Sequence, residues 1–143
     1  MKKFISIALA VLLVSTTIAM AGVAVAENDE ITTRADDFFS SYAISLTPTG
    51  SGSFLITFKT SAIATASQLG VITYSVQRKD GSSWTTVASG LSGQLGSNTS
   101  SYTFGRTYSG SSGQTYRVYA NHYCVKTNGL SKTVGSYSGT ITP

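Results

Sequence analysis

Between Phe38 and Pro143 the apolar residues recur in short runs at every second position, and no stretch of any length repeats them with helical spacing. Clusters of Gly, Ser and Asn separate these runs. A period of two, carried by Tyr, Phe, Ile, Val and Thr, is typical of half-buried β-strands. The pattern therefore predicts an all-β domain over residues 38–143.

The runs predict about seven strands, arranged as an antiparallel sandwich of two sheets. Their ranges are 42–46, 54–60, 71–78, 84–88, 102–108, 115–125 and 134–142. Because alternate side chains of a strand point to opposite faces, one residue in two is expected to face the core. The predicted core residues of the first three strands are Tyr42, Ile44, Leu46, Phe54, Ile56, Phe58, Ile72, Tyr74 and Val76.

The connections differ in how well the sequence defines them. Asp80 and Gly81 tolerate the positive φ angles of tight hairpin turns, so the third and fourth strands are expected to form a hairpin. Residues 62–69 are interpreted as a looser stretch with room for a helical turn. Residues 89–100, rich in Gly and Ser, are interpreted as a linker.

The first 26 residues have the pattern of a signal peptide. Lys2 and Lys3 precede a largely apolar run, and Ala24-Val25-Ala26 has the small-x-small form of a cleavage site. We expect cleavage after Ala26, with a start at Gly22 as the main competitor. A retained membrane anchor is the alternative, but the apolar run is short for a span and Ser15, Thr16 and Thr17 interrupt it.

Removing the first 26 of 143 residues leaves 117, the size of one domain. Residues 27–37 carry five acids without apolar periodicity, so they are interpreted as a flexible leader. The single cysteine, Cys124, cannot form an intramolecular disulfide. We expect a secreted monomer without a membrane segment after processing, extracellular or associated with the cell wall.

The order of elements resembles a fibronectin type III or immunoglobulin-like sandwich, most of all in GVITYSVQRKDGSSW and GQTYRVYAN. Tyr116, two residues before Val118, resembles the tyrosine corner of that family, which implies that its hydroxyl bonds back to the backbone at the crossing between the sheets. Phe58 stands where the family usually has Trp. The leader-plus-sandwich layout also resembles small exported proteins of Gram-positive bacteria, which implies no particular chemistry.

The residues that most suggest catalysis, His122 and Cys124, share the parity of Tyr116, Val118 and Ala120, which is that of the core. A thiol buried among apolar groups is inert. The domain body offers one carboxylate, Asp80, too few for paired-carboxylate hydrolysis or for a structural metal set. We therefore expect neither an enzyme nor a cofactor, and the sparse positive charge of the body does not indicate nucleic-acid binding.

The opposite parity of the sixth strand indicates a candidate binding face. If the third and sixth strands pair, that face consists of Gln77, Lys79, Arg117, Tyr119, Asn121 and Tyr123. Exposed tyrosines beside amides and cations can stack sugars or anchor a protein. The alternative is that Tyr simply suits a pleated surface. Trp84 is interpreted as a hairpin staple rather than as part of a carbohydrate platform.

These observations favour a secreted, non-enzymatic interaction module that contacts a protein or a cell-wall or glycan polymer. The alternative is a stand-alone carbohydrate-binding module, which would need two or three coplanar exposed aromatic side chains. Solvent exposure of Trp84, Tyr119 and Tyr123 distinguishes the two hypotheses.

Overall fold

The computed structural model describes residues 36–143, all in strands, turns and irregular segments. The signal peptide over 1–26 and residues 27–35 of the leader lie outside the described residues. Five strands follow one another: β1 (Phe39–Gly50), β2 (Ser53–Asp80), β3 (Ser83–Ser109), β4 (Tyr116–Lys126) and β5 (Ser131–Tyr137). Within the described part, no helix is long and apolar enough to cross a membrane.

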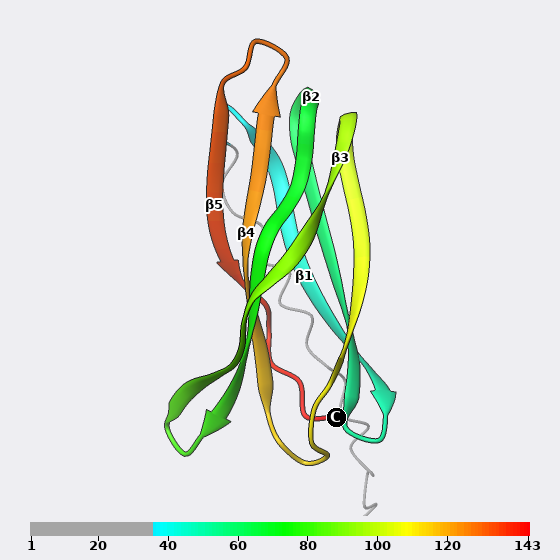
Figure 1. Ribbon diagram of the computed structural model, residues 1–143, viewed down its shortest axis with the longest axis vertical. Coiled ribbons are helices and arrows are strands. Elements are labelled where there is room, and N and C mark those ends of the chain that lie inside the picture. Colours follow the sequence, from blue (N-terminus) through cyan, green and yellow to red (C-terminus); the bar gives the residue numbers. More distant parts are fainter. Residues whose placement is uncertain (1–35) are drawn as a thin grey trace, which may run out of the picture.

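The strands form one antiparallel sheet in the order β1-β2-β4-β5, with β3 also paired to β2. Both β2 and β3 run the length of the molecule twice, because each folds back near one end (Figure 1). The first part of β2 pairs with β1 and the second part of β3, whereas its later part pairs with β4 and the first part of β3. The sheet is therefore curled, with one half facing the other.

This curl explains why the structure has five strands where the sequence predicts about seven. The predicted strands 54–60 and 71–78 are both part of β2, and 84–88 and 102–108 are both part of β3. The expected helical turn in 62–69 and the expected linker 89–100 are wrong, because both stretches are strand. At the bend, four residues of β2 (62–65) lie opposite the single Ser100 of β3, so β2 takes the longer, outer path.

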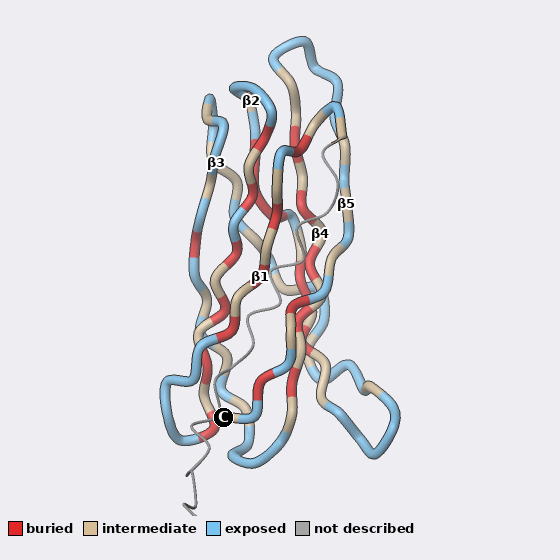
Figure 2. The backbone as a smooth tube through the Cα atoms, turned by 180° about the vertical axis from the view of Figure 1, so that it is seen from behind, coloured by how far each residue is buried: buried red, intermediate tan, exposed pale blue. Residues whose placement is uncertain are grey.

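The main core fills the space between the two halves of the curled sheet. Phe54, Ile56 and Phe58, from the first part of β2, are completely buried, as predicted, and belong to one cluster with Val76 and Val118. A second, smaller cluster around Phe39, Leu69 and Cys124 is also buried. Figure 2 shows buried residues alternating mainly with intermediate ones along β4 and the first part of β2.

The prediction that Ile72 faces the core is wrong. The β2–β4 register shifts between Val71 and Thr73, so Val71 is completely buried and Ile72 is 37% exposed. A bulge of this kind reverses the parity on one side of it, and for this reason Tyr74 and Val76 still face inward as predicted.

The predicted hairpin is present, with Asp80 opposite Ser83 and Gly81 at a φ of +61°. Only the glycine adopts positive φ there, not Asp80. The last predicted strand, 134–142, is wrong in its extent: β5 ends at Tyr137, and Ile141 joins the sheet again through an isolated bridge to Tyr116. Tyr137 is therefore 41% exposed while Ile141 is buried.

Candidate binding face

The predicted pairing of the third and sixth strands is confirmed, and it places the candidate face on the outer side of the sheet. The later part of β2 lies beside β4, with Gln77 opposite Arg117 and Ser75 opposite Tyr119. All the β4 members of the face are partly buried, whereas the residues between them belong to the core. Alternation along β4 thus separates an inner apolar face from an outer polar one.

Arg117 is the centre of this face. Its guanidinium carbon lies 4.3 Å from the ring centroid of Trp84 on β3 and 4.3 Å from that of Tyr137 on β5. Its Nε donates a 2.7 Å hydrogen bond to Oε1 of Gln77. Two aromatic contacts and one amide contact hold the planar guanidinium in a fixed place.

The aromatic row continues beyond Arg117. Tyr119 lies opposite Tyr137 in the β4–β5 register, and their ring centroids are 4.8 Å apart with the planes inclined by 52°. The ring of Tyr119 extends over Gly135, where a Cβ atom would meet the phenol oxygen. Gly135 therefore gives Tyr119 the room to lie across β5. We call Trp84, Arg117, Tyr119 and Tyr137, together with Gln77, the arginine-centred face.

The other predicted members lie at the margin of this face. Lys79 is exposed and opposite Trp84 in the hairpin register. Asn121 donates a 2.9 Å hydrogen bond to Thr73 Oγ1. Tyr123 lies opposite Thr133, four residues beyond Tyr119, which is about 13 Å at the usual rise of a strand. Tyr123 is thus on the same side of the sheet but apart from the arginine-centred face.

The sequence prediction missed two members of the face, Trp84 and Tyr137. The interpretation of Trp84 as a hairpin staple leaves out its main contact: from β3 it packs on Arg117 of β4, across the intervening strand β2. A two-residue turn at Gly81-Ser82 puts Trp84 opposite Lys79, so the hairpin register itself carried the signal. For Tyr137 the sequence holds no such signal. Its partner on β4 depends on the β4–β5 register, which is fixed by the loop between the two strands.

His122 and Cys124 lie in the core, as predicted. His122 is completely buried, its Nδ1 is 2.8 Å from Thr60 Oγ1, and its Nε2 is 3.0 Å from Ser136 Oγ. Burial lowers the pKa of His122 to about 4, so the ring is neutral at pH 7. Both ring nitrogens are occupied by hydroxyl groups, which is the arrangement of a structural histidine.

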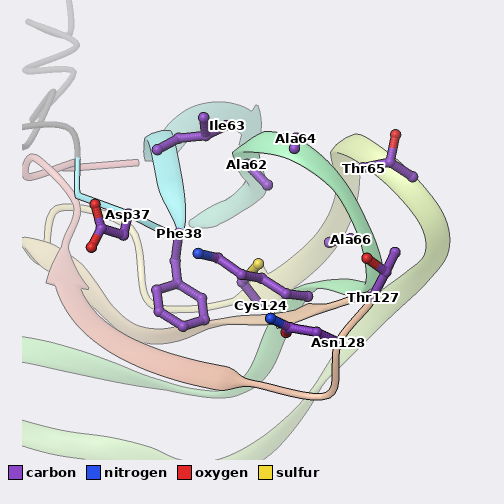
Figure 3. Close-up of a pocket in the computed structure, with 11 residues that line it drawn as sticks. Asp37, Phe38, Ala62, Ile63, Ala64, Thr65, Ala66, Cys124, Thr127 and Asn128 are labelled. Carbon is purple, nitrogen blue, oxygen red and sulfur yellow. The ribbon is translucent and has the colours of Figure 1, made fainter.

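A separate pocket of about 240 Å³ lies beside the start of β1. Three segments line it: Asp37 and Phe38, residues 62–66 at the bend of β2, and the end of β4 from Cys124 onward (Figure 3). Cys124 is only 1% exposed, and burial raises the pKa of its thiol. The thiolate needed for nucleophilic chemistry is therefore disfavoured in this pocket.

Two lysines near the pocket contact residues at the start of β1. Lys132 forms a 2.6 Å ion pair with Asp36, and Lys126 Nζ lies 4.3 Å from the ring centroid of Phe38. Asp36 also accepts hydrogen bonds from the backbone N–H groups of Phe38 and Phe39. These contacts fix the entry into β1.

No protein-family model, curated protein or solved structure matches this chain.

Proposed function

We propose that this chain is exported, is cleaved after Ala26, and acts outside the cell as a non-enzymatic interaction module that binds an envelope polymer through its arginine-centred face. The export step rests on the basic Lys2 and Lys3, the apolar run after them and the Ala24-Val25-Ala26 site. The mature domain, in this proposal, is secreted or held at the cell wall by what it binds.

We further propose that the domain is an immunoglobulin-like or fibronectin type III-like sandwich. The folded-back β2 and β3 supply two strand segments each. The first part of β2 pairs with β1, the later part of β2 pairs with β4, and β4 pairs with β5. The hydroxyl of Tyr116 accepts a hydrogen bond from the backbone of Ser111, five residues upstream, as a tyrosine corner would. Both features support this assignment.

One observation carries the functional proposal: an arginine held between Trp84 and Tyr137 on the outer face of a sheet. Aromatic and arginine side chains are the residue types that most often supply the binding energy of an interface. Here they come from three strands, β3, β4 and β5, and the Gln77 amide fixes the guanidinium between them. A surface organised in this way before a ligand arrives loses little side-chain entropy on binding.

A non-enzymatic role is supported by where the reactive groups lie. His122 is buried with both ring nitrogens engaged, and Cys124 is buried with a thiol pKa raised by burial. Neither side chain belongs to the arginine-centred face.

The alternative, a carbohydrate-binding module with a flat aromatic platform, is less well supported. Tyr119 and Tyr137 are inclined by 52°, and Trp84 is separated from Tyr137 by the guanidinium of Arg117. Stacking on the flat surface of a neutral polysaccharide needs coplanar rings. The inclined rings therefore favour binding of a single polymer chain that contacts Arg117.

Retention on the envelope fraction of the producing cell tests the proposal. The mature protein with both Tyr119→Ala and Tyr137→Ala is expected to lose retention, because two of the aromatic anchors are removed. Leu130→Ala is the control, since Leu130 is 59% exposed in the β4–β5 turn, away from the face. Equal retention of all three folded proteins, or none by the unaltered protein, contradicts the proposal.

A further inference from the structure

The guanidinium of Arg117 has an open edge. Gln77 occupies Nε, and the rings of Trp84 and Tyr137 cover the guanidinium. Among residues 36–143, neither terminal nitrogen of Arg117 has a protein hydrogen-bond acceptor. The two N–H groups at this end form the fork with which arginine binds an oxyanion end-on.

No carboxylate of the described chain neutralises this arginine. Asp36 pairs with Lys132, Asp80 pairs with Arg78, and Asp37 lines the pocket beside the start of β1. Lys79, exposed and opposite Trp84, adds a second positive charge at the margin of the face. The site therefore attracts anions, while the aromatic contacts keep the fork in one orientation.

The space at the open edge of the guanidinium, flanked by the rings of Trp84 and Tyr137, is called the slot below. Its shape favours a planar anion. A carboxylate is planar and can lie in the plane of the guanidinium, within the space between the aromatic rings. A tetrahedral phosphate projects out of that plane toward rings whose centroids lie only 4.3 Å from the guanidinium carbon. The ligand group that fits best is a carboxylate bound through two parallel hydrogen bonds.

The surroundings of the slot favour a polysaccharide over a protein as the carrier of that carboxylate. Polar groups border the inclined rings of Tyr119 and Tyr137: the Gln77 amide is bonded to Arg117 and to the Thr86 hydroxyl, and the Asn121 amide is bonded to the Thr73 hydroxyl. Protein interfaces concentrate apolar side chains at their centre, whereas a sugar chain presents C–H faces for the rings and hydroxyls for the amides. The slot also lies on an open sheet face, which a long chain can cross.

We infer that the arginine-centred face binds an acidic polysaccharide by holding a uronate carboxylate on the fork of Arg117, between Trp84 and Tyr137. This inference rests on the proposed function and names the ligand class of the same face.

The test is to measure the equilibrium binding of decagalacturonate to the mature protein by titration calorimetry. The fully methyl-esterified decamer keeps the sugar rings but loses the carboxylates, so its affinity is expected to be at least tenfold lower. Arg117→Lys keeps the charge but loses the fork, and a loss of about tenfold is expected from one bidentate contact. Arg106→Lys is the matched control, because Arg106 also lies over an aromatic ring, Phe104, but outside this face.

Each outcome decides the inference. Equal binding of the ester, unaltered binding by folded Arg117→Lys, or no binding of decagalacturonate overturns it. Tighter binding of poly-glutamate indicates a protein partner, and tighter binding of inorganic polyphosphate indicates a phosphate site; both also overturn it. Envelope retention that needs Tyr119 and Tyr137 but not Arg117 removes this inference and leaves the proposed function standing. The ester comparison uses the unaltered protein, so it decides even if Arg117→Lys does not fold.

Discussion

The hydroxyl oxygen of Tyr116 lies 2.8 Å from the backbone nitrogen of Ser111 and accepts its hydrogen bond. The Tyr116 ring packs over Gly110, where a Cβ atom would lie 2.8 Å from Cζ, and it contacts the rings of Phe54 and Tyr108. The loop between β3 and β4 is thus tied to the first residue of β4 by a phenol whose ring belongs to the core. No disulfide ties this loop down within the described residues, so the hydrogen bond between Ser111 and Tyr116 acts as its non-covalent cross-link.

Tyr116→Phe should lower the free energy of unfolding by about 1 kcal/mol, because the Ser111 N–H loses its partner while the ring packing is kept. Urea denaturation measures this difference. Tyr119→Phe is the matched control on the same strand and should change stability by less than about 0.5 kcal/mol. Equal stability of the two variants would show that the corner bond contributes nothing.

The native thiol of Cys124 should be protected from modification. It is 1% exposed in the smaller core cluster, and burial raises its pKa, so both access and thiolate population are low. An aromatic disulfide reagent at pH 7.5 should react with it at least about a hundredfold more slowly than in guanidinium chloride. Rapid reaction of the native protein would place the thiol at an open surface.

The sequence predicts those parts of the fold in which one face of a strand is buried. Phe54, Ile56 and Phe58 alternate with polar residues, and the alternation alone identifies their inner face. The pattern fails over 89–100, because the first part of β3 contains no fully buried residue and its strand character comes from backbone pairing with β2. Backbone hydrogen bonds do not require apolar residues at alternate positions, so a strand held mainly by them shows no period-two pattern in the sequence.

The same reasoning explains what could be predicted of the arginine-centred face. Arg117 and Tyr119 follow from parity along one strand, and Gln77 follows from pairing of two strands. Tyr137 was beyond reach because its neighbour depends on the register set by the turn before β5, where Lys126 N–H donates to the carbonyl of Leu130. A site assembled across four strands, β2 to β5, needs every register, whereas the sequence specifies only some of them.

Gly93→Ala should be strongly destabilising. A Cβ atom there would collide with the carbonyl oxygen of Val71, which is backbone and cannot rotate away. The loss should reach about 3 kcal/mol, at the upper end for forced overpacking. Gly105→Ala on the same strand is the control, because the one close approach of its Cβ would be to the flexible Leu55 side chain, at 3.1 Å, and the backbone oxygen of Ile56 would be at an ordinary 3.7 Å. Similar melting temperatures for both variants would contradict the close approach at Gly93.

The contact between Arg117 and Trp84 has a spectroscopic signature, since Trp84 is the single tryptophan of the chain. Arg117→Ala removes the group that covers one side of the indole, so the emission maximum should move to longer wavelength. The stability should fall by about 1 kcal/mol, as for a partly exposed cation–π contact. Lys79→Ala, opposite Trp84 in the hairpin, should leave the maximum in place. An unchanged spectrum in Arg117→Ala would mean that the guanidinium does not lie on the indole.

The stability of the domain should fall as the pH is lowered from about 6.5 to about 4, because of His122. Burial lowers the pKa of this ring to about 4 in the folded protein, whereas in the unfolded chain it has its ordinary value of 6.5. Above pH 6.5 the ring is neutral in both states, so the folded protein has its full stability. Below pH 6.5 the unfolded chain takes up a proton that the folded protein excludes, so the unfolded state is stabilised relative to the folded state until the pH reaches about 4. The total loss is on the order of 3 kcal/mol.

Urea denaturation at half-unit pH steps measures this loss, and His122→Gln identifies its source. The variant should be less stable at pH 7, because the Thr60 and Ser136 hydroxyls lose their ring partners, but its stability should be nearly constant from pH 6.5 to 4.5. Asp36 and Asp80 contribute little slope above pH 4.5, because their stabilising effect is lost mainly as the pH falls through and below 3.8, their ordinary pKa. Although burial raises the pKa of Asp36, Lys132 and two backbone N–H groups lower it below its usual value, and Arg78 lowers that of Asp80. A slope that persists in His122→Gln, or a flat profile in the unaltered protein, would show that the ring is not held neutral by the core.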